Sequence, residues 1–231
     1  MSPTRRILVI VTSTGEYETV GYRTGLWLGE LTHFYDVAEQ AGYEITIASI
    51  DGGPVPLDPE SLAHGVLGDL GTDKRYTDRR FMDKLKDTMA VSEADAEDYD
   101  AIYLTGGHGT MFDFHQTPAL GALIARFHDT GRIVSAVCHG PCGFLDVTLS
   151  SGEPLVKGRN VTGFSWQEEE LAQRANAVPY SLEDRLKELG ASYTTAEKPF
   201  APHIVEDDRL ITGQNPGSAK GVAEAVVRRL G

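Results

Sequence analysis

The sequence has no long apolar run. No stretch of its 231 residues approaches the roughly 18 apolar residues that a membrane-spanning helix requires. Residues 1–6 lead into a short apolar run with no small-residue cleavage site behind it, which differs from a secretory signal peptide. We therefore expect a cytoplasmic protein that does not interact with membranes.

Basic residues and cysteines are also few. Lys and Arg number 21 against 34 Asp and Glu, so the net charge is -13. Such a surface repels nucleic-acid phosphates and anionic lipids, and no basic stripe interleaved with aromatic residues offsets it. We therefore expect no nucleic-acid partner. We interpret the excess of acidic residues as a feature that keeps the protein soluble. The two cysteines, Cys138 and Cys142, are expected to be free thiols, because structural disulfides are rare in the cytosol.

The chain lacks internal repeats, low-complexity tracts and domain linkers, so we expect a single domain over residues 1–231. Short apolar runs alternate with segments of helical periodicity. The predicted strands cover residues 6–12, 44–49, 101–105 and 133–137, and the predicted helices cover residues 23–40 and 119–129. Strands this apolar are buried on both faces. The pattern predicts an α/β fold with a flavodoxin-like, mostly parallel sheet sandwiched by helices.

A long insertion separates the second and third predicted strands. Residues 50–99 exceed an ordinary crossover, and residues 81–89 show helical patterning. We expect a small helical cap there, over one end of the sheet. The last third predicts strands at 160–162, 192–194, 203–205 and 210–212, and helices at 168–174, 182–189 and 219–230. Ser181 suits a helix start and Gly190 a helix stop.

Residues 134–143, VSAVCHGPCG, end an apolar strand at Cys138. Ligands of open α/β sheets bind at this end of the strands. Ala136 and Gly140 give the small-residue spacing of a nucleophile elbow, a tight and strained turn. A helix N-terminus behind Cys138 would lower the pKa of its thiol and favour the thiolate. A free cysteine is more often a small core residue, so both interpretations stay open.

Two neighbours of Cys138 are ambiguous. His139 suits a general base or a helix cap, and a catalytic role would need a third group to orient its ring. Cys142, one helical turn further on, is expected to pack in the core rather than to act in redox chemistry.

Glu30 lies within the apolar stripe of the first predicted helix, four residues after Leu26 and four before Phe34. A buried carboxyl group has a raised pKa and can donate a hydrogen bond to a thiolate. The alternative is that the helix rolls and Glu30 reaches solvent.

The loop over residues 104–109, LTGGHG, follows the third predicted strand. Its glycines allow close approach of the backbone, and its amides could form an oxyanion hole. It lacks the lysine of a phosphate-binding P-loop. We predict no metal site, because no histidine shows metal-ligand spacing with a carboxylate. The histidines assigned to the surface or core on this ground are His33, His64, His108, His115, His128 and His203.

Five motifs along nearly the whole chain occur in the order of one superfamily. They are RTGLWLGELTHFYDV at 23–37, GGHGTMFD at 106–113, AVCHGP at 136–141, VTGFS at 161–165 and TGQNPGSA at 212–219. Together they resemble the class I glutamine-amidotransferase-like superfamily, which includes intracellular proteases and deglycases. Within it they are similar to the heat-shock chaperones with glutathione-independent glyoxalase (glyoxalase III) activity. The resemblance implies a homodimer.

The resemblance also implies roles for single residues. Cys138 would be the nucleophile, His139 its partner, and Glu30 the acid that hydrogen-bonds the thiol. A further acid beside His139 would come from residues 168–170, of which Glu169 aligns best by its distance from Gly163. The implied oxyanion hole consists of the backbone amides of Gly107, His108 and His139.

We therefore expect an enzyme that converts the small aldehyde methylglyoxal into lactate without a cofactor, a lyase of the D-lactate dehydratase class. Glutamine amidotransferases use a histidine from a late loop, but residues 213–216 read GQNP, so glutaminase activity is disfavoured. The alternatives are a cysteine amidase or peptidase, a protein deglycase, a holdase chaperone and a sensor of oxidation.

Overall fold

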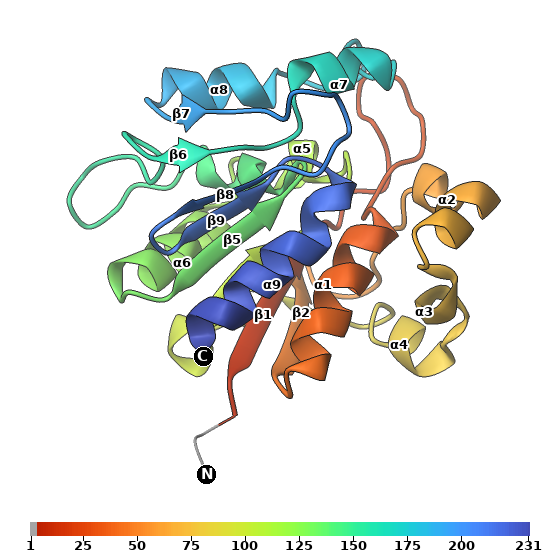
Figure 1. Ribbon diagram of the computed structural model, residues 1–231, viewed down its shortest axis with the longest axis horizontal. Helices are drawn as coiled ribbons and strands as arrows, with labels where there is room; N and C mark the ends of the chain where they lie inside the picture. Colours follow the sequence, from red (N-terminus) through yellow and green to blue (C-terminus); the bar gives the residue numbers. More distant parts are fainter. Residues whose placement is uncertain (1–3) are drawn as a thin grey trace.

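A computed structural model describes residues 4–231, with a seven-stranded sheet at its centre (Figure 1). Residues 1–3, part of the segment predicted not to be a signal peptide, lie outside the described residues. All neighbouring strands are parallel except β8 and β9, which confirms the mostly parallel sheet. Across the sheet the strands are β3 (Met89–Ala90), β2 (Glu44–Ser49), β1 (Arg6–Val11), β4 (Ala101–Leu104), β5 (Ile133–Val137), β9 (Leu210–Gly213) and β8 (Ile204–Asp207).

Helices cover both faces of this sheet. One face packs against α1 (Leu28–Gln40) and α9 (Ala219–Leu230), which lie side by side in Figure 1. The other packs against α6 (Pro118–Asp129). The strands between these layers are apolar because their side chains point alternately into two cores. None of the helices formed by residues 4–231 is long and apolar enough to cross a bilayer.

The first predicted helix begins five residues too early. Helix α1 starts at Leu28, because Trp27 is extended and Leu26 pairs with Leu57 in an isolated bridge. Gly25 has φ +149°, and the Leu26 amide donates to the carbonyl of Pro56 at 2.8 Å. The sequence 23–27 therefore forms a connection between sheet and helix. This connection brings Trp27 to the carboxyl end of the sheet, where it lines a cavity described below.

Residues 50–99 contain three short helices, α2 (His64–Asp69), α3 (Asp73–Thr77) and α4 (Arg79–Asp83), stacked beside α1 in Figure 1. Arg75 donates to Asp36 of α1 at 2.6 Å, and Phe81 packs edge-on against Tyr35. The helix predicted over 81–89 is wrong beyond Asp83: Thr88 pairs with Gly53, and β3 follows. The treatment of 50–99 as an inserted cap within one domain stays a prediction.

The last third adds a small second sheet of β6 (Asn160–Val161) and β7 (Ser192–Tyr193), which are parallel. Helices α7 (Trp166–Leu171) and α8 (Leu182–Glu188) lie above it in Figure 1. The Ser181 side chain accepts a hydrogen bond from the Asp184 amide, so the predicted helix start is confirmed. One further short helix, α5 (Thr110–Asp113), follows the glycine loop. The carboxyl ends of β1, β4, β5 and β9 thus meet beneath the α7 region.

Candidate active site

Cys138 occupies a strained turn directly after β5. Its φ is +57°, in the left-handed region that residues other than glycine rarely adopt. The backbone closes tightly around it: a Cβ atom on Gly106 would lie 2.8 Å from Cys138 Cβ, and one on Gly140 would lie 2.5 Å from the carbonyl oxygen of Leu104. The tight turn predicted from the small residues is therefore confirmed. Only a five-residue 3-10 helix, Gly140–Phe144, follows it.

The thiol, an imidazole and a carboxylate form a hydrogen-bonded chain. Cys138 Sγ lies 3.3 Å from His139 Nδ1, and His139 Nε2 lies 2.8 Å from Glu169 Oε2. All three residues are buried. Burial, followed by the charge of nearby His108, lowers the pKa of His139. Although burial opposes ionisation of Glu169, the charges of the two histidines and their hydrogen bonds lower its pKa. The arrangement keeps an oriented imidazole beside a thiol.

Three consecutive glutamates, residues 168–170, lie within α7, and each has a different environment. Glu169 contacts His139, in agreement with the residue favoured by its distance from Gly163. Glu168 is fully buried but points elsewhere: it caps α7 through Ser165 and accepts from the Phe200 amide at 2.7 Å. Glu170 is exposed. Only Glu169 is therefore placed to orient the imidazole.

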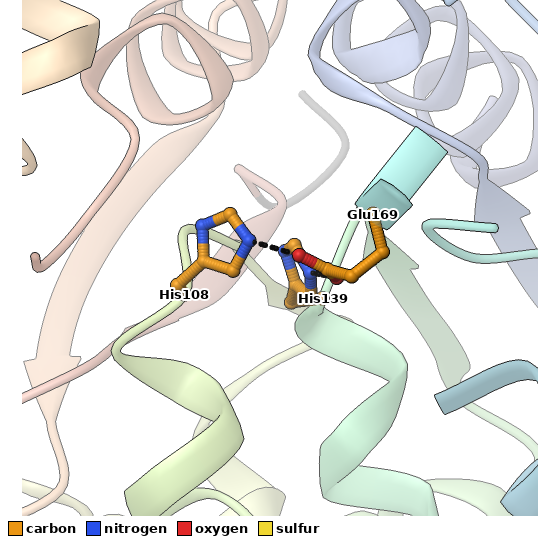
Figure 2. A group of neighbouring side chains, drawn as sticks. All are labelled: His108, His139 and Glu169. Atoms are coloured by element: carbon orange, nitrogen blue, oxygen red, sulfur yellow. Dashed lines mark hydrogen bonds and ion pairs between the residues drawn. The ribbon is translucent and has the colours of Figure 1, made fainter. Parts of the chain in front are cut away.

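The side chain of His108 is a member of the site that the sequence did not indicate. His108 Nε2 lies 2.6 Å from Glu169 Oε1, so one carboxylate bridges two histidines (Figure 2). His108 is buried, as the prediction of a surface or core histidine allows, but that prediction did not include its contact with Glu169. The position of His108 directly after Gly106 and Gly107 was the one sequence feature that could have indicated a role in the site. Its hydrogen bond to Glu169 joins residues 61 positions apart, which a local pattern does not reveal.

Glu30 is fully buried, which excludes the alternative that it reaches solvent. Its Oε2 accepts from the Gly106 amide at 2.6 Å, and no hydrogen-bond partner of Oε1 is found among the residues the structure describes. Burial raises the pKa of Glu30 to about 8, with the neighbouring Cys138 side chain acting in the opposite direction. Glu30 is consequently protonated at neutral pH, as a hydrogen-bond donor to sulfur must be.

The prediction that a helix N-terminus lowers the thiol pKa is wrong. Burial, followed by the charge of Glu30, raises the pKa of Cys138 well above its ordinary value. The 3-10 helix after the turn is too short to offset these effects. The Gly107 amide does favour the thiolate, as an oxyanion-hole donor would. A Cβ atom on Gly107, whose φ is +97°, would lie 2.1 Å from the Gly25 carbonyl oxygen.

The thiol borders a cavity of about 130 Å³. Most of the wall is apolar or aromatic, and the charged side chain Glu60 stands in it. The lining residues are Trp27, Glu60, Gly107, His108, Cys138, His139, Phe164, Ala172, Phe200 and Pro216. Drug-sized ligands occupy pockets of roughly 300–1,000 Å³, so this cavity suits a molecule of only a few non-hydrogen atoms.

The chain is similar to known proteins over nearly its whole length. It is 34% identical over 233 residues to "Glyoxalase 3" of Candida albicans, covering 96% of this chain and 97% of that protein. It is 30% identical to "Glutathione-independent glyoxalase HSP31" of Saccharomyces cerevisiae, covering 96% of each.

Solved structures agree with this similarity. The Candida albicans glyoxalase III structure matches at TM-score 0.84 and 32% identity, over 97% of this chain and 96% of that one. The Francisella tularensis Rapid Encystment Protein matches at TM-score 0.93 and 34% identity, over 99% and 100%. The model of the DJ-1/PfpI family matches residues 24–229. The chain therefore belongs to the DJ-1/PfpI family.

Proposed function

We propose that this protein is a glutathione-independent glyoxalase that converts methylglyoxal into lactate. The observation that carries the proposal is a thiol, 3.3 Å from an oriented imidazole, that opens into a cavity of about 130 Å³. Relatives that align over nearly the whole chain bear the name glutathione-independent glyoxalase. Within this proposal the enzyme is a lyase of the D-lactate dehydratase class.

In the first step, the Cys138 sulfur attacks the aldehyde carbon of methylglyoxal and forms a hemithioacetal. The thiol proton passes to His139 Nδ1, 3.3 Å from the sulfur, and from there to the former aldehyde oxygen, which completes the hemithioacetal and leaves the ring neutral. Protonated Glu30 stabilises the sulfur as its charge develops, because a neutral carboxyl group can donate where a carboxylate repels. Because burial disfavours a free thiolate at Cys138, the developing negative charge on sulfur needs the hydrogen bond that Glu30 donates.

The second step moves a proton between adjacent carbons. Neutral His139 removes the proton from the first carbon, an enediol forms, and the same ring returns this proton to the second carbon. The hydroxyl proton of the first carbon passes to the oxygen of the second carbon, which leaves a thioester of lactate. Glu169 holds the ring and stabilises its cationic form. Water then hydrolyses the thioester to lactate and restores the thiol. The sum is methylglyoxal plus water to lactate, with no oxidant or cofactor.

The oxyanion formed in these steps needs hydrogen-bond donors. We assign this role to the amides of Gly107, His108 and His139, and the hydrogen bond of the Gly107 amide to the Cys138 side chain supports the assignment. The side chain of His108 contributes indirectly: its Nε2 lies 2.6 Å from Glu169 Oε1 and holds the carboxylate that orients His139.

The size of the cavity separates this function from its rivals. Amide or peptide hydrolysis and protein deglycation would use the same thiol, but their substrates extend well beyond a cavity of this volume. A holdase chaperone would not need Cys138, and a sensor of oxidation would not need the cavity. A homodimer and a cytoplasmic location remain parts of the proposal.

The test is lactate formation from methylglyoxal by the purified protein without glutathione. Cys138→Ala should reduce the rate by at least about 10³-fold, as loss of a nucleophile does. Cys142→Ala is the matched control, because Cys142 is equally buried but packs against Met111 Sδ at 3.0 Å, and it should retain most of the activity. Lactate production that survives in Cys138→Ala contradicts the proposal.

A further inference from the structure

We propose that His108, His139 and Glu169 also form a binding site for a divalent transition metal, best suited to zinc, and that bound metal blocks the thiol. The inhibition of the Cys138 thiol by bound metal rests on the proposed function, whereas the binding of the metal does not. We predicted no metal site from the sequence, because these three residues come from a glycine loop, the turn after a strand and a helix, and show no ligand spacing along the chain.

The three side chains converge. Both histidines direct Nε2 toward the Glu169 carboxylate, at 2.6 and 2.8 Å (Figure 2). The potential ligand atoms all lie within 4.8 Å of one another. Ligands of tetrahedral zinc, at bond lengths of 2.0–2.1 Å, lie about 3.3 Å apart. Small rotations of these side chains therefore suffice to replace the shared protons with one ion.

The chemistry of the ligands favours zinc over calcium or magnesium. Two imidazoles and one carboxylate form the protein ligand set of several zinc sites, whereas the hard cations prefer oxygen alone. All three residues are nearly buried, yet His108 and His139 also line the cavity, which provides an entry path and room for a fourth ligand. The protein's net charge of -13 favours cations near its surface.

Cys138 is not a ligand of this ion. Its sulfur lies at Nδ1 of His139, whereas Glu169 and the ion lie at Nε2 on the other side of the ring. A metal on Nε2 leaves the proton of the neutral imidazole on Nδ1. The ring then faces the thiol as a donor and cannot accept its proton. Metal binding consequently removes the base without touching the nucleophile.

The direct test is titration of the apo protein with Co²⁺, followed by absorption spectroscopy, and with Zn²⁺ in equilibrium dialysis. We expect one ion per chain, and cobalt bands without thiolate charge transfer. His108→Asn and Glu169→Gln should each weaken binding by about 10-fold or more. Cys138→Ser should bind as the wild type does. His115→Asn is the matched control, because His115 pairs with Asp146 at 2.8 Å, away from the cavity.

Two results would overturn the site: loss of binding in Cys138→Ser, or unchanged binding in both His108→Asn and Glu169→Gln. Thermal unfolding of each variant shows whether a loss of binding reflects misfolding. Lactate formation is then measured with added Zn²⁺ and after chelation, and inhibition should weaken in His108→Asn in parallel with affinity. Binding without inhibition overturns the blocking. Binding in a protein that makes no lactate refutes the proposed function and leaves the metal site standing.

Discussion

At the scale of single residues, the acidities of Glu30 and Cys138 are coupled. Each is fully or almost fully buried, and the charge of Glu30 raises the pKa of the Cys138 thiol. Burying two negative charges side by side is costly, so the pair holds at least one proton at neutral pH. Glu30 is therefore a donor in the resting site, and its ionisation should be visible in the stability of the protein.

We expect the wild type to lose stability as pH rises. Burial raises the pKa of Glu30 from an ordinary 4.5 to about 8, so its contribution is complete below pH 4.5 and is lost as pH rises through 8. Glu30→Gln cannot ionise. Relative to wild type, it should gain on the order of 3 kcal/mol in free energy of unfolding between pH 5 and pH 9. Urea unfolding across this range measures the difference.

Glu188→Gln is the control, because the Glu188 side chain is 69% exposed. It should follow the wild type at every pH. Parallel curves for wild type and Glu30→Gln would show that Glu30 does not change its ionisation in this range.

The sequence predicted the residues whose local pattern is unusual. Glu30 interrupts an apolar stripe, and Cys138 ends a buried strand between small residues, so both were recognisable. The side chain of His108 was not, because its partner Glu169 lies on a separate element. The thiol pKa was predicted with the wrong sign, since burial and the charge of Glu30 depend on packing.

At the scale of elements, the start of α7 joins three parts of the site. Glu168 accepts from Ser165 at the helix start, from the Phe200 amide at 2.7 Å and from Asn215 Nδ2 at 2.9 Å. Phe200 has φ +62° and lines the cavity, so this contact holds a strained residue in place. Glu168, the neighbour of Glu169 in the chain, therefore shapes the wall of the cavity.

Glu168→Gln should lower the free energy of unfolding by about 1–3 kcal/mol and raise KM more than it lowers kcat. An amide has one accepting oxygen, and its NH₂ group faces donors that it cannot satisfy. Denaturant unfolding and steady-state kinetics with methylglyoxal test this. Glu170→Gln, the exposed neighbour on the same helix, should resemble the wild type. Equal effects of the two substitutions would contradict the assigned role.

The boundaries of three regular elements were predicted correctly from hydrophobic periodicity. The predicted bounds of β2 and β5 match the structure, and α9 matches as well. The start of α1 and the segment after α4 were wrong, because isolated bridges to residues 57 and 53 hold these stretches extended. Such bridges depend on partners distant in sequence, which periodicity does not report.

At the scale of the whole molecule, two distant segments meet at the edge of the cavity. Glu60, from the 3-10 helix Pro59–Leu62, forms an ion pair with Arg174, which follows α7. Glu60 also lines the cavity. The sequence predicted the region 50–99 as a cap, but this contact spans 114 residues and could not be foreseen.

We expect Arg174→Gln to increase the access of solvent to Cys138. An exposed ion pair contributes up to about 1 kcal/mol, so the rate of Cys138 alkylation should rise by about two- to fivefold. Peptide mass spectrometry after timed exposure to iodoacetamide measures this rate. Arg79→Gln is the control, because the Arg79 side chain is 90% exposed. A rate equal to that of the wild type would show that the pair does not limit access.

The shared carboxylate of Glu169 also bears on how the chain folds. The bonds that define the site join residues separated by 76 positions (Gly106 and Glu30) and 61 positions (His108 and Glu169). Contacts between residues this far apart form only after the loop between them has closed, which costs chain entropy. Folds rich in such contacts, parallel sheets among them, therefore form slowly. The nascent chain therefore carries Cys138 as an ordinary solvated thiol. Its special environment is a property of the finished fold.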